Sequence, residues 1–148
     1  MLDKLKFYID GQWVDPVEPR TLDVVNPATE AVYGRISLGS AADVDKAVAA
    51  ARRAFTSYSR TTREQRLDLL KSILAEFKNR HNDVAEAIMD EMGAPWSLAK
   101  GAQALSGPQH FKAAIKALES YEFDEHLGTT NVVREPIGVC GLITPWNW

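Results

Sequence analysis

The sequence predicts an α/β fold in which strands at both ends of the chain flank a helical middle. A hairpin signal, Phe7–Val14, lies near the start, and an apolar run broken by two glycines, Ile137–Ile143, lies near the end. Between them, apolar residues recur every three or four positions. Continuous or alternating apolar runs favour strands, whereas this longer period favours helices. We therefore expect a hairpin, a helical segment and then strands of an open sheet, which together form an incomplete α/β fold.

Composition excludes several function classes. The 148 residues, 45% hydrophobic and 25% charged, are typical of a globular domain. A net charge of −3 provides no basic field for nucleic acid. No apolar run approaches the roughly 20 residues of a membrane helix, and charges interrupt the start where a secretory signal needs an apolar block. The single cysteine fits a reducing compartment. We expect a cytoplasmic protein with neither nucleic-acid nor membrane partners.

The first predicted zone is β. Asp10-Gly11 stands between two apolar segments, which is the strongest short signal for a hairpin turn. The segment Leu22–Thr29 predicts a second strand, which ends at the turn dipeptide Asn26-Pro27 within it. A third strand, around 32–37, is expected to pair back onto it.

The second zone is helical. Ser40 with Asp43, and Thr62 with Gln65, have the spacing of capping boxes at two helix starts. Apolar stripes follow each start. They comprise Val44, Ala47, Val48, Ala51 and Phe55 in the first helix, and Leu67, Leu70, Leu74 and Phe77 in the second. Such stripes predict packing faces rather than cofactor sites.

Glycine and proline divide the rest of the helical zone. A third helix is expected from near Asn82 to Gly93, because glycine favours helix C-termini. A short helix follows Pro95. Pro108 suits the first turn of a further helix, so we expect a break just before it.

The third zone returns to β. Residues 128–135 combine a glycine start with β-branched residues, and Pro136 separates them from the run Ile137–Ile143. We expect that run to be a buried strand that ends by presenting Asn147 between two tryptophans. Asparagine also favours turns, so a turn residue is the alternative interpretation of Asn147.

Other catalytic signatures are missing. The three histidines have no metal-ligand spacing with each other, with Cys140 or with an acidic cluster. Cys140 stands among apolar neighbours, where a thiol is typically an inert small hydrophobe. The sequence has neither a phosphate-binding lysine loop nor a G-x-G-x-x-G fingerprint.

Several segments together resemble the NAD(P)-dependent aldehyde dehydrogenase superfamily. The most specific is Glu135-Pro-Ile-Gly-Val-Cys-Gly-Leu-Ile-Thr-Pro-Trp-Asn-Trp148, which matches a family hallmark. Weaker matches precede it, at Phe7–Val14, Val25–Thr29, Ala41–Phe55 and Asp90–Pro95. The chain is thus similar to the N-terminal part of such an enzyme. Residues 96–109 depart from the common pattern, and Ala94 replaces a frequent lysine, so the subfamily is left open.

This resemblance implies a division of the chain. Residues 1–122 would form the N-terminal hairpin and helices of a cofactor-binding domain. Residues 123–136 would form part of an oligomerisation hairpin, which implies a homo-oligomer. Residues 137–148 would form the first, truncated strand of a Rossmann-like core.

It also implies site residues. Asn147 would donate a hydrogen bond to the oxyanion that forms when a cysteine thiolate attacks an aldehyde. Ile143, Thr144, Pro145 and Trp146 would line NAD or NADP, with core packing at a strand end as the alternative. The parent enzyme would then oxidise a small-molecule aldehyde to a carboxylic acid.

A monovalent-cation site would use Asp90 and the carbonyls of Val24 and Val25, by resemblance to some family members. A capping or surface role is the alternative for Asp90. The family's nucleophilic cysteine and glutamate base lie beyond Asn147. We therefore expect this chain alone to be inactive.

The rival hypothesis is a non-catalytic interaction or oligomerisation module derived from the same family. Whether the gene continues into a long cysteine-bearing region discriminates the two. The sequence leaves open which aldehyde is used, whether the cofactor is NAD or NADP, and whether the acid is released to water or to coenzyme A. It also leaves open the oligomeric state and the origin of the truncation.

Overall fold

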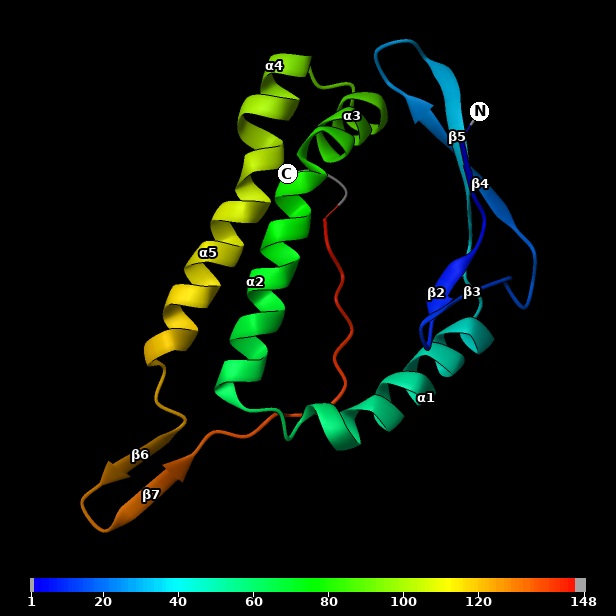
Figure 1. Cartoon of the computed structure of the whole chain (residues 1–148). Helices are drawn as coiled ribbons and strands as arrows, with labels where there is room; N and C mark the ends of the chain where they lie inside the picture. Colours follow the sequence, from blue (N-terminus) through cyan, green and yellow to red (C-terminus); the bar gives the residue numbers. More distant parts are fainter. Residues whose placement is uncertain (1, 146–148) are drawn as a thin grey trace.

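A computed structural model describes residues 2–145 of the chain (Figure 1). Seven strands and five helices with one π-helical turn follow one another in these residues. The strands are β1 (Leu2–Lys4), β2 (Phe7–Ile9), β3 (Gln12–Val14), β4 (Thr21–Asn26), β5 (Ala31–Ser37), β6 (Asp124–Leu127) and β7 (Thr130–Val133). The helical elements are α1 (Ala41–Tyr58), α2 (Arg63–Asn79), α3 (His81–Met92), α4 (Trp96–Leu98), the π-helical η1 (Ala99–Gln103) and α5 (Ala104–Ser120).

The predicted hairpin is confirmed as the antiparallel pair β2–β3. Phe7 faces Val14 and Ile9 faces Gln12 across it. Asp10 and Gly11 both have positive φ, 55° and 75°. Two positive φ values define the turn that matches the twist of hairpin strands, and aspartate followed by glycine accepts them at low cost. The dipeptide therefore fixed this turn.

A second small sheet has the strand order β1-β5-β4. The antiparallel β4 and β5 were predicted, and the Asn26 side chain stabilises their turn by accepting hydrogen bonds from the backbone N–H groups of Ala28 (2.9 Å) and Thr29 (3.3 Å). The parallel strand β1 was not predicted. A Cβ on Gly34 would lie 2.1 Å from the carbonyl oxygen of Leu2, so β1 can approach β5 only because residue 34 is glycine.

Both predicted capping boxes are present, at the starts of α1 and α2. Asp43 does more than cap. It is buried, and its carboxylate accepts hydrogen bonds from the backbone N–H groups of Ser40 and of Val17, each at 2.9 Å. These bonds and the Ser40 hydroxyl hold the pKa of Asp43 below its ordinary value. One side chain thus ties the loop before β4 to the start of α1.

The α2 and α5 helices run antiparallel and pack side by side (Figure 1). The rings of Phe77 and Phe111 lie 6.4 Å apart between them. Gly107 permits this approach, because a Cβ there would lie 2.6 Å from the Phe77 ring. Leu74 and Ile115 are the large buried side chains of the pair.

The expected helix break before Pro108 is wrong. Pro108 lies inside α5, which continues from η1 with helical backbone at its first residue. Proline lacks the N–H that would bond one turn back. Pro108 is buried, however, on a helix that packs against α2. Its burial in the folded chain compensates for the one lost backbone bond, as tertiary contacts often override local propensity.

The expectation of a buried strand at Ile137–Ile143 is also wrong for this structure. Residues 134–145 form neither helix nor strand and run as an extended trace back from the β6–β7 hairpin (Figure 1). Ile137 is 93% exposed and Ile143 is 98% exposed. A strand needs a neighbour for its backbone hydrogen bonds. The described residues provide none at this segment.

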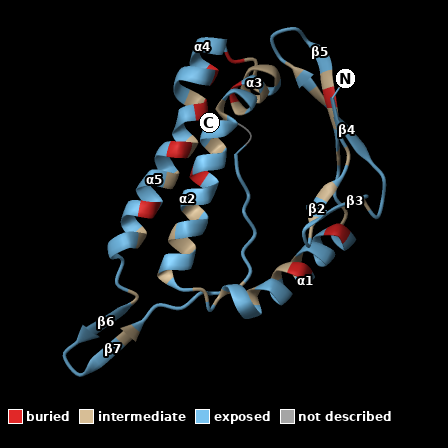
Figure 2. Ribbon diagram, viewed as in Figure 1, coloured by how far each residue is buried: buried red, intermediate tan, exposed pale blue. Residues whose placement is uncertain are grey.

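The core is thin. Buried residues are scattered along the helices, the loop between α3 and α4 and one strand rather than gathered in one layer (Figure 2). Most of the buried apolar residues are alanines, and none of the large side chains is fully buried. The surface measures 11016 Å², whereas a compact monomer of this length exposes roughly 7,500 Å². The elements therefore present apolar faces that no part of the described chain covers.

Candidate functional site

The predicted cofactor residues lie on the open segment that follows β7. Ile143, Thr144 and Pro145 are all exposed. Trp146 and the predicted catalytic Asn147 lie outside the described residues. The segment offers an apolar side chain at Ile143, a hydroxyl at Thr144 and backbone groups that no described strand engages. The described residues form no opposing wall against these exposed groups, so the segment by itself does not make an enclosed site.

Cys140 lies on the same segment and is exposed. Its Sγ is 4.0 Å from the carbonyl oxygen of Gly138, the one hydrogen-bond contact recorded for it. No basic side chain hydrogen-bonds to this thiol among residues 2–145. The exposed position differs from the apolar surroundings expected for Cys140, and that it is not an activated nucleophile stays a prediction.

The predicted cation ligands lie on elements that contact each other. α3, which carries Asp90, packs against β4, which carries Val24 and Val25. The β4–β5 register shifts between these two valines, so Tyr33 of β5 is left without a partner at a β-bulge. Bulges re-aim backbone groups and occur next to functional sites.

Asp90 lies beside Tyr33. Burial raises the pKa of Tyr33, and the negative charges of Asp90 and Glu91 raise it further. The residues from 2 to 145 contain no group of three or more His, Cys, Asp or Glu side chains that could hold a metal. A cation here would therefore depend on backbone carbonyls together with the single carboxylate of Asp90.

The C-terminal end of α3 is fixed against the β4–β5 turn by Gly93. This residue has a φ of 67°, the left-handed conformation that glycine adopts at helix ends. A Cβ at this position would lie 2.7 Å from Cγ of Pro27 and 3.3 Å from the backbone nitrogen of Ala28. The glycine predicted only as a helix stop thus also sets the distance between Asp90's helix and β4.

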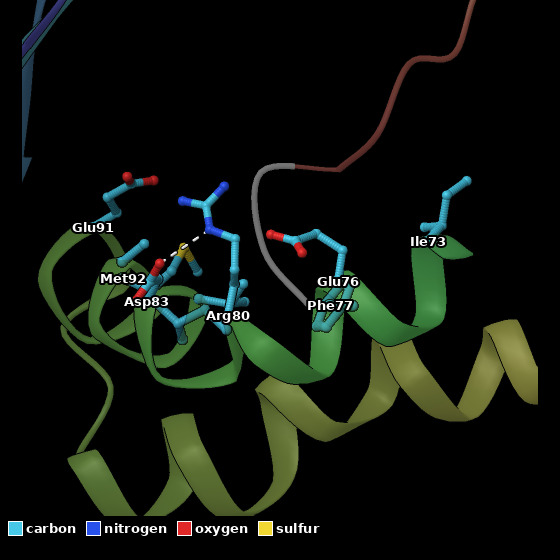
Figure 3. Close-up of a pocket in the computed structure, with 10 residues that line it drawn as sticks. Ile73, Glu76, Phe77, Arg80, Asp83, Glu91 and Met92 are labelled. Carbon is cyan, nitrogen blue, oxygen red and sulfur yellow. Dashed lines mark hydrogen bonds and ion pairs between the residues drawn. The ribbon is translucent and has the colours of Figure 1, made fainter. Parts of the chain in front are cut away.

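Sequence reasoning missed an apolar groove between the C-terminal half of α2 and α3 (Figure 3). Its volume is about 570 Å³. Apolar side chains form most of the lining, namely Ile73, Phe77, Val84, Ala87, Ile88 and Met92. Figure 3 shows the charged residues that border it, with Arg80 Nε 3.0 Å from Asp83 Oδ2. Glu76 and Glu91 carry the remaining negative charge of the border.

The sequence contained a signal for the apolar groove between α2 and α3. Phe77 belongs to the apolar stripe predicted for the second helix, and Val84 and Ile88 have the four-residue spacing of a helix face within the predicted third helix. Such stripes predict that a face is apolar. They do not reveal whether the same chain covers that face, and here it lies open.

A membrane-crossing helix is absent from residues 2–145, since none of their helices combines the necessary length with sufficient hydropathy.

Comparison with known proteins gives consistent matches. A family model described as the aldehyde dehydrogenase family matches residues 13–148. A 3-succinoylsemialdehyde-pyridine dehydrogenase from a Pseudomonas species is 55% identical, over 100% of this chain and 31% of that protein. A putative aldehyde dehydrogenase of Staphylococcus aureus is 48% identical, again over 100% of this chain and 31% of that protein. The chain thus spans about a third of the length of these relatives.

Solved structures agree. The crystal structure of an aldehyde dehydrogenase C variant from Pseudomonas syringae, complexed with NAD+ and octanal, matches with a TM-score of 0.92 and 48% identity. The match covers 95% of this chain and 29% of that one. Betaine aldehyde dehydrogenase from Staphylococcus aureus, complexed with NAD+, matches with a TM-score of 0.88 and 29% identity, over 97% of this chain and 30% of that one.

These matches confirm the predicted α/β class and its correspondence to a portion of a larger fold. With a family model matched over most of its residues, the chain belongs to the aldehyde dehydrogenase family.

Proposed function

We propose that this chain is the N-terminal part of an enzyme that oxidises an aldehyde to a carboxylic acid with NAD or NADP. The reaction passes through a thiohemiacetal on a cysteine outside this chain. One observation carries the proposal. The family match runs through residues 13–148 and so includes the closing segment with Asn147. Two solved relatives are NAD+ complexes, and one of them also holds octanal.

Asn147 is the residue of this chain with a direct chemical role. When a thiolate attacks the aldehyde carbon, the carbonyl oxygen gains a negative charge. A neutral amide N–H fixed beside that oxygen stabilises the charge without a proton transfer. Removing one such donor costs about 10²–10³ in kcat.

Ile143, Thr144, Pro145 and Trp146 supply one wall of the cofactor site. NAD or NADP supplies the hydride acceptor when bound. The exposed backbone and side chains at 143–145 are available for this contact because no described element covers them. Their place next to Asn147 in the chain puts cofactor and oxyanion donor on consecutive residues.

The 148-residue chain alone is proposed to be inactive. Its single cysteine is exposed, and no base within hydrogen-bond reach activates it among the described residues. Incubation of the chain with aldehyde and NAD should give no NADH above the background rate. Formation of NADH at an enzyme-like rate would contradict this part of the proposal.

Residues 123–136 are proposed to take part in homo-oligomerisation. They contain the β6–β7 hairpin, whose strands are exposed along nearly their whole length. The chain's surface of 11016 Å² exceeds that of a compact monomer by roughly 3,500 Å². A standard protein interface buries about 1,600 Å² in total. The exposed area is thus sufficient for both self-association and contact with further segments of the enzyme.

The remaining predictions from the sequence are part of the same proposal about the complete enzyme. Residues 1–122 belong to the cofactor-binding domain, and residues 137–148 become the first strand of its Rossmann-like core once a neighbouring strand is present. Val24, Val25 and Asp90 bind a monovalent cation. The enzyme acts in the cytoplasm.

The decisive experiment uses the complete enzyme. Asn147→Ala should lower kcat about 10²–10³-fold for a small aldehyde, while an alkylating reagent still modifies the nucleophilic thiol. Asn79→Ala, which changes an exposed asparagine at the end of α2, is the matched control and should leave kcat unchanged. Unchanged turnover in Asn147→Ala would refute the proposal. A complete protein without a reactive thiol would favour the non-catalytic module instead.

A further inference from the structure

One arginine joins the helices to the base of the β6–β7 hairpin. Arg63, in the first turn of α2, donates a hydrogen bond from Nη2 to the carbonyl oxygen of Tyr121. Its Cζ lies 5.8 Å from the centroid of the Phe123 ring. The rings of Tyr121 and Phe123 pack edge to face with centroids 4.9 Å apart. A single guanidinium therefore contacts two of the residues that lead from α5 into β6.

The other interactions that hold the hairpin lie within the hairpin and its base. The backbone N–H of Arg134 donates to the carbonyl of Phe123 at 2.9 Å, and Arg134 Nη2 lies 2.7 Å from Glu125 Oε2. These bonds hold the two strands to each other, not to the helices. A two-stranded hairpin in water is at best marginally stable. The contact of Arg63 with the hairpin base therefore limits the directions in which the hairpin can project from the helix pair.

The chemistry of this contact requires arginine. A guanidinium can donate hydrogen bonds in its plane while its face lies against an aromatic ring, whereas lysine presents a point charge without a face. Arg63 Nε is buried and has no hydrogen-bond partner among residues 2–145. A buried unpaired donor costs free energy.

We propose that Arg63 is a positioning residue for self-association. It holds the β6–β7 hairpin in the orientation in which the hairpin's exposed strand edges meet a second copy of this chain. The inference rests on the homo-oligomer proposed above. Orienting the hairpin before contact lowers the conformational entropy lost on association. The contacts of Arg63 with Tyr121 and Phe123 therefore strengthen assembly, although Arg63 itself makes no contact between subunits.

The test uses the complete enzyme and two readouts. Light scattering over a concentration series measures the dissociation constant of the oligomer, and hydrogen exchange measures protection of the hairpin amides. Arg63→Ala should raise the dissociation constant about tenfold or more and speed exchange in β6 and β7, with α2 and α5 unchanged. Arg63→Lys should show much of the same loss. Arg60→Ala, at an exposed arginine three residues earlier, should resemble the parent enzyme.

A double-mutant cycle separates positioning from a general structural role. If Arg63 acts through the Phe123 ring, Arg63→Ala should have a much smaller effect on association in a Phe123→Leu background. An oligomer as strong in Arg63→Ala as in Arg60→Ala would overturn the inference, as would strictly additive effects in the cycle. A parent enzyme that is monomeric at every concentration would refute the proposed assembly itself. Aldehyde oxidation is measured in a separate assay. The proposed activity is therefore tested independently of the proposed assembly and of the role of Arg63.

Discussion

Replacing Gly93 by alanine should destabilise the protein for two separable reasons. The residue has a φ of 67°, which an L-residue with a Cβ adopts at a cost of about 1–2 kcal/mol. The added Cβ would also lie 2.7 Å from Cγ of Pro27, well inside van der Waals contact. Relieving such an overlap in a packed site costs about 1–3 kcal/mol. Together these effects predict a loss of about 2–5 kcal/mol in the free energy of unfolding.

Gly11 provides the matched control. Its φ of 75° is nearly the same, but nothing lies within 4 Å of its Cβ position. Gly11→Ala should therefore show the backbone cost alone, about 1–2 kcal/mol. Urea unfolding followed by circular dichroism measures both variants. The difference between them isolates the contact with Pro27.

A third variant tests the contact directly. Adding Pro27→Ala to Gly93→Ala removes the Cγ atom and should restore part of the stability, seen as a favourable coupling in a double-mutant cycle. If Gly93→Ala cost no more than Gly11→Ala, the α3 terminus would not be held against the β4–β5 turn as the structure has it. The arrangement that brings Asp90 toward β4 would then lose its support.

Three further predictions concern Asp43, Gly107 and Asp90. Hydrogen bonds lower the pKa of Asp43 in the folded protein. The ionised carboxylate therefore stabilises the folded protein at pH values above its unfolded-state pKa of about 3.9. This stabilisation is lost as the pH falls through the folded-state pKa. Asp43→Asn should accordingly be less stable at neutral pH, and urea midpoints should converge with those of the parent below about pH 4; parallel curves would contradict this. Gly107→Ala should destabilise the protein because its Cβ would lie 2.6 Å from the Phe77 ring, yet in a Phe77→Leu background it should stabilise by about 1 kcal/mol through helix propensity. The same sign in both backgrounds would exclude the contact. Finally, sodium or potassium chloride should raise the melting temperature of the complete enzyme more than choline chloride does, and Asp90→Asn should abolish the difference; an unchanged difference would refute the cation site.

Local sequence signals determined much of the fold. The Asp10-Gly11 turn, the two capping boxes and the Gly93 helix end were all predictable, because each depends on hydrogen bonds or backbone conformations within about four residues. Family membership was likewise predictable from the closing segment, residues 135–148. The site residues it implies, Asn147 above all, stay predictions.

The sequence did not predict the features that depend on contacts distant in the chain. Pro108 is a helix-start signal by itself, but in the folded chain it is buried inside α5. β1 pairs with β5 because residue 34 lacks a side chain at their contact. The hydrogen bond from Arg63 to the carbonyl of Tyr121 joins α2 to a loop 58 residues away in the sequence. No local sequence pattern indicates that residues at this separation lie close together.

The final segment shows the same division most clearly. Its apolar run, Ile137–Ile143, determines that the segment is suited to a buried strand, since apolar side chains gain free energy when they leave water. Only tertiary structure decides whether that strand forms, because its backbone needs a neighbouring strand to supply hydrogen bonds. In residues 2–145 no such neighbour is present, and the run lies exposed. Turns and helix caps depend on residues that are close together in the sequence. Strand pairing and hairpin orientation depend on groups that only the folded chain brings together.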